Sequence, residues 1–440
     1  MKKTYIDTAM ERIAPDLILK GGNVVDVFSG RVIKADVIIK DGIICGVGSY
    51  SGENEQDVSG KYVMPGFIDS HVHIESSMTQ PSEYAKAVMP HGITTVIADP
   101  HEITNVCGED GLEFMLKSAK NIPLDVNLML PSCVPATPFE HTGANLDAKT
   151  TQKLAPKFFG IGEMMNYPGI VSGDDETLGK LCLDIIDGHA PLLSGHELDA
   201  YTSAGIKTDH ECSVVEEMTE KISKGMYILL REGTLSLDVA KLIKGVTPYT
   251  LRRCAFCTDD RFVGEIIRDG SIDHCIRKAV SLGLNNIDAI IMATLNACEM
   301  YGMKNKGAIA PSYVADIVVA DDLNLSSISQ VYKNGKLVCE NGTALFECET
   351  VDNSKVTNTV HLPKISADFF KTDVKDKFDA IELIPESIIT KKVTVSYSDS
   401  LSKVCVIERH HNLGTKGIGF VTNYGITNGA IATSIGHAPQ

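Results

Sequence analysis

Between Met64 and Arg261 the sequence alternates short apolar, strand-like runs with stretches of helical character. This alternation predicts a parallel sheet whose strands are joined by crossover helices. Eight strand candidates in about 200 residues match the size of a compact TIM-like (β/α)8 barrel. The candidates end at His73, Ala98, Leu130, Glu163, His189, His210, Arg231 and Asp259. The predicted fold class is therefore α/β, with a barrel at its centre.

Most of these strands end in a His, Glu, Asp or Arg residue. In such barrels the carboxyl ends of the strands form the active-site face. His71 and His73 are two residues apart on one strand, so both imidazoles share a face and can bind one cation. Glu163 can bridge two cations because a carboxylate has two oxygens. His189 and His210 would complete the second metal site.

The eighth strand candidate ends in two neighbouring carboxylates, Asp259 and Asp260. We expect Asp259 to bind the first metal, although alternation along the strand does not choose between the two. Two cations roughly 3.5–4 Å apart hold a bridging hydroxide whose pKa is lowered to near neutrality. Asp259 would take its proton and pass it to a leaving group. Each residue alone also has a structural interpretation, such as a helix cap. Together they predict a metal-dependent hydrolase.

β-rich segments flank the barrel on both sides in the sequence. They predict one small, discontinuous β-sandwich domain. Beyond Val351 the composition changes, which indicates a further α+β domain. We expect this C-terminal domain to be incomplete and to expose an apolar remnant, because the chain stops just after an apolar run. The predicted domains are 1–63 plus 305–350 (β-sandwich), 64–304 (barrel) and 353–440 (C-terminal).

The net charge of −16 argues against nucleic acid or an anionic membrane as a partner, since both favour Lys and Arg. No apolar run reaches the ~18 residues of a membrane span. The N-terminus lacks the apolar core of a signal peptide. The cysteines are scattered through apolar segments, as reduced core thiols would be. We therefore expect a cytoplasmic protein.

The run from Met64 to Ser77, MPGFIDSHVHIESS, resembles the opening motif of the amidohydrolase superfamily, and in particular that of the bacterial adenine deaminases. Many amide-cleaving members of the superfamily carry a carbamylated Lys on strand four, where this chain has Glu163, which fits the deaminases. The resemblance continues through segments 91–95, 99–103, 130–135, 162–166, 187–191, 204–211, 230–234, 257–261 and 408–414.

The resemblance implies hydrolytic deamination of adenine to hypoxanthine and ammonia, in purine salvage or adenine catabolism. It implies two divalent transition metals, Mn or Fe, and a small purine base as the partner; we also expect a homodimer. His101 and Glu102 would lie at the substrate. Glu75 and Glu102 are the candidates for the acid that protonates a purine ring nitrogen. Alternatively, Glu75 and Glu102 would support the metal-binding histidines through hydrogen bonds. The implied metal ligands are His71, His73, Glu163, His189, His210 and Asp259.

The sequence is also compatible with two other functions. One is an amidohydrolase that acts on a cyclic amide or another aminated heterocycle, because a fold alone does not choose a substrate. The other is a truncated, catalytically silent chain that still folds its barrel.

Overall fold

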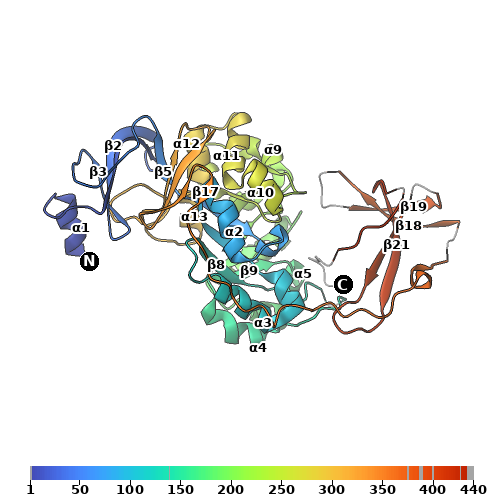
Figure 1. The fold of residues 1–440 in the computed structure, drawn as a ribbon. Helices are drawn as coiled ribbons and strands as arrows, with labels where there is room; N and C mark the ends of the chain where they lie inside the picture. The colour runs from blue at the N-terminus through green and yellow to red at the C-terminus, as the bar shows by residue number, and fades with distance from the viewer. Residues whose placement is uncertain are drawn as a thin grey trace.

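The structure is a computed structural model that describes residues 2–137, 139–373, 376–385, 390–398, 401–426 and 428–433. Three parts follow one another in Figure 1: a sheet built partly from the N-terminal segment, the barrel, and a C-terminal sheet. Residues 434–440, on which the expectation of an incomplete C-terminal domain depends, lie outside the described residues. Among the described residues, no helix has the length and apolar character needed to cross a membrane.

Eight parallel strands form the barrel, and each of the eight strand candidates overlaps one of them, so the predicted TIM-like fold is confirmed. Hydrogen bonding joins them in a run of five (β6 to β10) and a run of three (β11 to β13). A bridge between Val72 and Asp259 connects β13 back to β6. The strands are β6 (Phe67–Val72), β7 (Ile93–Ala98), β8 (Asp125–Leu130), β9 (Gly160–Met164), β10 (Ile186–Gly188), β11 (Thr208–Asp209), β12 (Tyr227–Arg231) and β13 (Cys254–Cys257).

The other neighbouring barrel strands are joined by backbone hydrogen bonds, but between β10 and β11 the described residues form no backbone ladder. Side chains connect the two strands instead. Thr208 Oγ1 accepts a hydrogen bond from Gly188 N at 3.0 Å, and Asp209 Oδ1 accepts one from Ala190 N at 2.9 Å. A Cβ atom on Gly188 would lie 2.1 Å from the carbonyl oxygen of Thr208, so only glycine allows this close approach.

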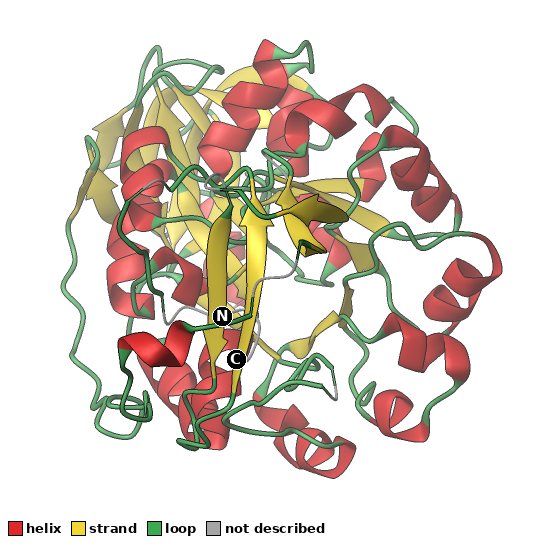
Figure 2. Cartoon of the chain, turned by 90° about the vertical axis from the view of Figure 1, so that its right-hand side faces the viewer, coloured by secondary structure: helices red, strands yellow, loops and turns green. Residues whose placement is uncertain are grey.

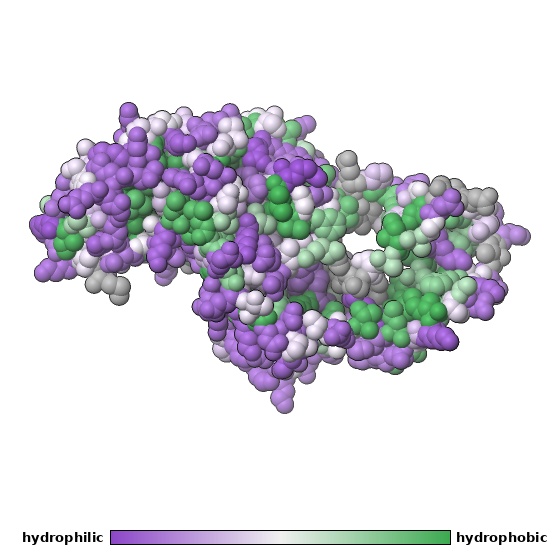
Figure 3. All heavy atoms as spheres, in the orientation of Figure 1, coloured by the Kyte–Doolittle hydropathy of each residue, from purple (hydrophilic) through white to green (hydrophobic). Residues whose placement is uncertain are grey.

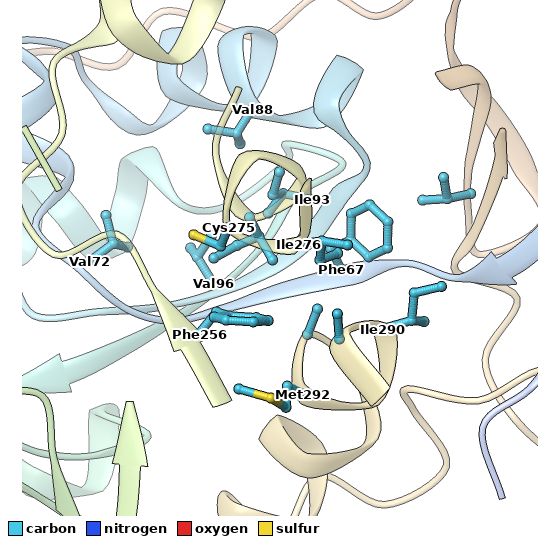
Figure 4. Packing of buried hydrophobic residues seen from close by; sticks show 14 of the residues in the cluster. Phe67, Val72, Val88, Ile93, Val96, Phe256, Cys275, Ile276, Ile290 and Met292 are labelled. Carbon is cyan, nitrogen blue, oxygen red and sulfur yellow. The ribbon is translucent and has the colours of Figure 1, made fainter. Parts of the chain in front are cut away.

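Helices cover the outside of the barrel and bury a large apolar core. In Figure 4, Phe67, Val96 and Phe256 from the strands pack with Cys275 and Ile276 of a covering helix. All twelve cysteines are free. The helices are α1 (Lys2–Ala9), α2 (Pro81–Val88), α3 (His101–Ser118), α4 (Ala148–Leu154), α5 (Tyr167–Ser172), α6 (Asp175–Gly179), α7 (Gly195–Ser203), α8 (Val215–Ser223), α9 (Val239–Leu242), α10 (Val263–Asp269), α11 (Ile272–Ser281), α12 (Asn286–Met292) and α13 (Leu295–Met300).

A nine-stranded sheet combines segments from before and after the barrel in the sequence. Its two halves meet where β14 pairs with β5 in antiparallel register, Val318 opposite Met64. The domain boundaries at residues 63, 305 and 350 stay a prediction. The strands are β1 (Leu17–Asp26), β2 (Arg31–Lys40), β3 (Ile43–Gly48), β4 (Glu55–Asp57), β5 (Tyr62–Pro65), β14 (Ile317–Ala320), β15 (Ile328–Lys333), β16 (Lys336–Glu340) and β17 (Thr343–Ala344).

The C-terminal sheet has the strand order β19-β18-β21-β20 and lies in front of the barrel in Figure 2. Beyond β20, His411 Nε2 lies 3.1 Å from the carbonyl oxygen of Thr142, in the loop that follows β8. Apolar side chains such as Tyr397 and Ile381 are exposed on this sheet, and green patches mark it in Figure 3. The strands are β18 (Lys377–Leu383), β19 (Thr390–Ser396), β20 (Ser402–Ile407) and β21 (Lys416–Thr422).

Candidate metal centre

The histidines at the end of β6 lie beside the carboxylate that follows β13. His71 Nε2 and His73 Nε2 are 3.1 Å apart. Asp259 Oδ1 is 3.6 Å from the first of these nitrogens and 3.1 Å from the second. On the other side, Glu163 Oε1 is 3.4 Å from His73 Nε2. Four side chains from three separate strand ends are therefore brought to one buried place.

The second oxygen of Glu163 faces the other two predicted histidines. Glu163 Oε2 is 2.6 Å from His189 Nδ1 and 3.1 Å from His210 Nε2. One carboxylate thus lies between two groups of histidines, with one oxygen towards each group. A ligand shared by two cations needs this placement. All six residues predicted to bind metal lie in this cluster.

The structure distinguishes the two neighbouring aspartates that follow β13. Asp259 faces His71 and His73, whereas Asp260 Oδ1 accepts a hydrogen bond from Ser76 Oγ. Asp259 has a φ of +56°, so the chain leaves the extended conformation at this residue. Side-chain alternation along a strand therefore does not apply here. Burial would raise the pKa of Asp259, but hydrogen bonds from His71 and His73 outweigh it and hold the pKa well below its usual range.

Arg231, at the end of β12, holds the second oxygen of Asp259. Its guanidinium donates to Asp259 Oδ2 at 2.9 Å and to Asp238 Oδ2 at 3.1 Å, and it forms a close ion pair with Glu211. The guanidinium is buried among these three carboxylates. This contact leaves the other oxygen of Asp259 directed at the histidines.

His101 and Glu102 begin α3 and lie directly beside the cluster. His101 Nδ1 is 3.1 Å from Glu163 Oε1, and Glu102 Oε2 is 3.7 Å from His73 Nδ1. Glu102 Oε1 lies 3.0 Å from Ser76 Oγ. Both side chains are buried. The structure therefore places the two residues predicted to contact substrate next to the predicted metal ligands.

Glu75 lies in the same buried region. Its Oε1 accepts a hydrogen bond from the backbone N of Ile103 at 3.3 Å, and its Oε2 has no hydrogen-bond partner among the described residues. Burial raises the pKa of Glu75 well above its ordinary value, and the nearby charge of Glu102 raises it further. The raised pKa favours the protonated carboxyl group, which is the form that can serve as an acid.

Asp99, which follows β7, is part of the site although sequence analysis gave it no role. Its Oδ2 accepts a hydrogen bond from Glu163 N at 3.0 Å, and its carbonyl oxygen is 2.8 Å from His73 Nδ1. A Cβ atom on Gly162 would lie 2.1 Å from Asp99 Oδ2, so glycine is needed beside it. The signal was present in the sequence: Asp99 is also a carboxylate directly after a barrel strand.

The donor atoms of this cluster fit a divalent metal centre. Because the carbonyl of Asp99 can only accept, His73 Nδ1 carries a hydrogen, so a proton lost from the ring leaves Nε2 and frees the lone pair that a metal binds. Burial would lower the pKa of His71, but Asp187 and Asp259 raise it to about 10, so the carboxylates favour positive charge here. Groups of three ligand atoms, such as those of Glu163, His189 and His210, lie within 4.8 Å of one another.

The sequence of this chain is similar to those of known protein families and characterised relatives. Residues 62–338 match the model described as "Amidohydrolase family", and residues 383–439 match "Adenine deaminase C-terminal domain". The adenine deaminase of Clostridium acetobutylicum is 47% identical, over 98% of this chain and 79% of its own length. The adenine deaminase of Halalkalibacterium halodurans is 44% identical, over 96% of this chain and 76% of its own length.

Solved structures show the same fold at low sequence identity. An enamidase of the amidohydrolase superfamily has a TM-score of 0.55 at 18% identity and covers 74% of this chain and 96% of its own. The atrazine chlorohydrolase of Arthrobacter aurescens, solved with zinc and atraton, has a TM-score of 0.54 at 15% identity and covers 77% of this chain and 98% of its own.

Proposed function

The chain belongs to the amidohydrolase family and, within it, to the adenine deaminases, and we propose that the barrel site performs the deaminase reaction. Adenine and water give hypoxanthine and ammonia. The observation that best supports this proposal is the position of Glu163, whose two carboxylate oxygens face two different groups of histidines. Neither the alternative substrate classes nor the silent form is favoured, because the relatives named above are adenine deaminases. The homodimer and the cytoplasmic location stay predictions.

The amidohydrolase superfamily uses a divalent metal centre, and we propose Mn or Fe as the metal here. His71, His73 and Asp259 would hold one cation and His189 and His210 the other, with Glu163 shared between them. When bound, the two cations supply Lewis-acid activation of the water that attacks carbon 6 of adenine.

The chain's own side chains move the protons. Asp259 accepts a proton from the attacking water and passes it to the departing amine. Glu75 gives its proton to ring nitrogen N1 and recovers one from the new hydroxyl group at carbon 6 as the carbon–nitrogen bond breaks. We assign this role to Glu75, because burial raises the pKa of its carboxyl group. His101 and Glu102 would contact the purine.

An ammonia-release assay tests the function. Protein depleted with a chelator and reconstituted with Mn²⁺ is expected to contain close to two metal ions per chain and to release ammonia from adenine. Chelation is expected to abolish the activity, and adding Mn²⁺ back is expected to restore it. Cytosine and a dihydropyrimidine are the control substrates. Turnover of either control without turnover of adenine would overturn the assignment.

Replacing Glu75 with glutamine is expected to lower kcat for adenine by about 10²-fold, at the lower end of the range for general acid catalysis. Glutamine is nearly the same size but has no acidic proton to give. Metal analysis of the variant should still show two ions per chain, because Glu75 is not a proposed ligand. Glu102→Gln is the matched comparison. A larger kcat loss in Glu102→Gln than in Glu75→Gln would transfer the acid role to Glu102.

A further inference from the structure

The two halves of the proposed metal centre are supported by different kinds of bond. On one side, backbone hydrogen bonds join the ends of β6 and β13. Asp259 N donates to the carbonyl of His71 at 3.0 Å, and His73 N donates to the carbonyl of Asp259 at 3.2 Å. The three proposed ligands of the first cation are therefore fixed to one another through the backbone itself.

On the other side, the proposed ligands of the second cation follow strands that share no ladder in the described part of the chain. His189 comes directly after β10, and His210 directly after β11. Next to His189, Ala190 N donates to Asp209 Oδ1 at 2.9 Å, and Asp209 immediately precedes His210. The relative positions of these two histidines therefore depend on side chains.

Lys221 of α8 is the centre of this side-chain connection. Its ammonium group is fully buried and has one acceptor for each of its three donors. Lys221 Nζ donates to Ala190 O at 2.7 Å, to Asp209 Oδ2 at 2.9 Å and to Glu217 Oε1 at 2.7 Å. Glu217 Oε1 in turn accepts from Leu192 N at 2.7 Å. The ammonium group of Lys221 thus joins the segment after β10 to β11 and to α8.

We propose that Lys221 is a positioning residue that sets the separation of His189 and His210 and thereby the affinity for the second cation. This inference rests on the ligand set of the proposed function. Removing the ammonium group leaves the buried carboxylates of Asp209 and Glu217 without the positive charge that pairs with them, which is costly in an interior. The segments after β10 and β11 keep the hydrogen bonds of Gly188 N to Thr208 Oγ1 and of Ala190 N to Asp209 Oδ1 but lose the three bonds of Lys221, so the separation of His189 and His210 is less fixed. The ligands of the first cation keep their backbone bonds.

The test is a Mn²⁺ titration of metal-free protein by calorimetry, comparing wild type with Lys221→Met. We expect one site with wild-type affinity and a second site weakened 10- to 100-fold, the range for residues that orient metal ligands. The matched control is Lys333→Met. Lys333 is also buried between two carboxylates, Asp125 at 2.8 Å and Asp316 at 2.7 Å, but near the amino end of β8. This control is expected to keep both sites.

The titrations test the positioning role of Lys221 and the proposed set of metal ligands separately. Two sites of wild-type affinity in Lys221→Met, or two sites weakened equally, would overturn the positioning role. If the methionine variant does not fold by circular dichroism, Lys221→Arg is titrated in its place. It keeps the charge but alters the donor geometry, and a selective loss at one site is again expected. Glu163→Gln is titrated in parallel, because two unaltered sites in that variant would refute the ligand set itself.

Discussion

Replacing Glu163 with glutamine is expected to lower kcat for adenine deamination by about 10⁴-fold, the size of effect seen when a carboxylate that organises a catalytic histidine becomes an amide. Glu163 Oε1 faces His73 and Oε2 faces His189 and His210, so its charge serves both halves of the site. An amide has nearly the same shape but no charge, and one of its ends carries hydrogens that repel a cation. Steady-state ammonia release and metal analysis measure the two effects.

The Glu163→Gln protein is also expected to contain fewer than two metal ions per chain. Its control is Glu216→Gln, which makes the same chemical change at an exposed position on α8 and is expected to leave kcat and metal content unaltered. Circular dichroism of both variants checks that the barrel is folded. Wild-type turnover in folded Glu163→Gln would contradict the bridging role.

The second large effect is expected from Asp259→Asn, with a loss in kcat of about 10³-fold, within the range for a lost general base. Asparagine keeps the hydrogen bond from Arg231 but cannot accept the proton from water. Asp260→Asn is the matched control, because Asp260 is the neighbouring carboxylate and accepts a hydrogen bond from Ser76. We expect a much smaller loss there. Equal losses in the two variants would contradict the assignment of the base to Asp259.

Much of the fold could be predicted from periodicity. The run at 227–231 was predicted as a strand and is β12 (Tyr227–Arg231), and the other seven candidates also overlap barrel strands. In a parallel barrel all strands point the same way, so any polar residue that ends a strand reaches the same face. For this reason the sequence alone predicts that Glu163 and His210, 47 positions apart in the chain, lie close together.

Other features of the site depend on contacts that no local pattern contains. Asp99 ends a strand like the other site residues, but its role was recognisable only from its hydrogen bond to Glu163 N and from the space left by Gly162. Lys221 lies within a helix and gives no sequence signal of its part in the site. Its connection to the site arises only in the folded chain, where its ammonium group reaches Asp209 and Ala190.

The sequence by itself determined the barrel and the face on which the ligands gather, since strand direction and strand ends follow from the spacing of apolar and polar residues. Only the tertiary structure decided which of Asp259 and Asp260 faces His71 and His73. The physical reason is the left-handed backbone at Asp259, where φ is +56°, together with the guanidinium of Arg231 that holds its outer oxygen. Both arise from packing between β6, β12 and β13, which are distant in the chain.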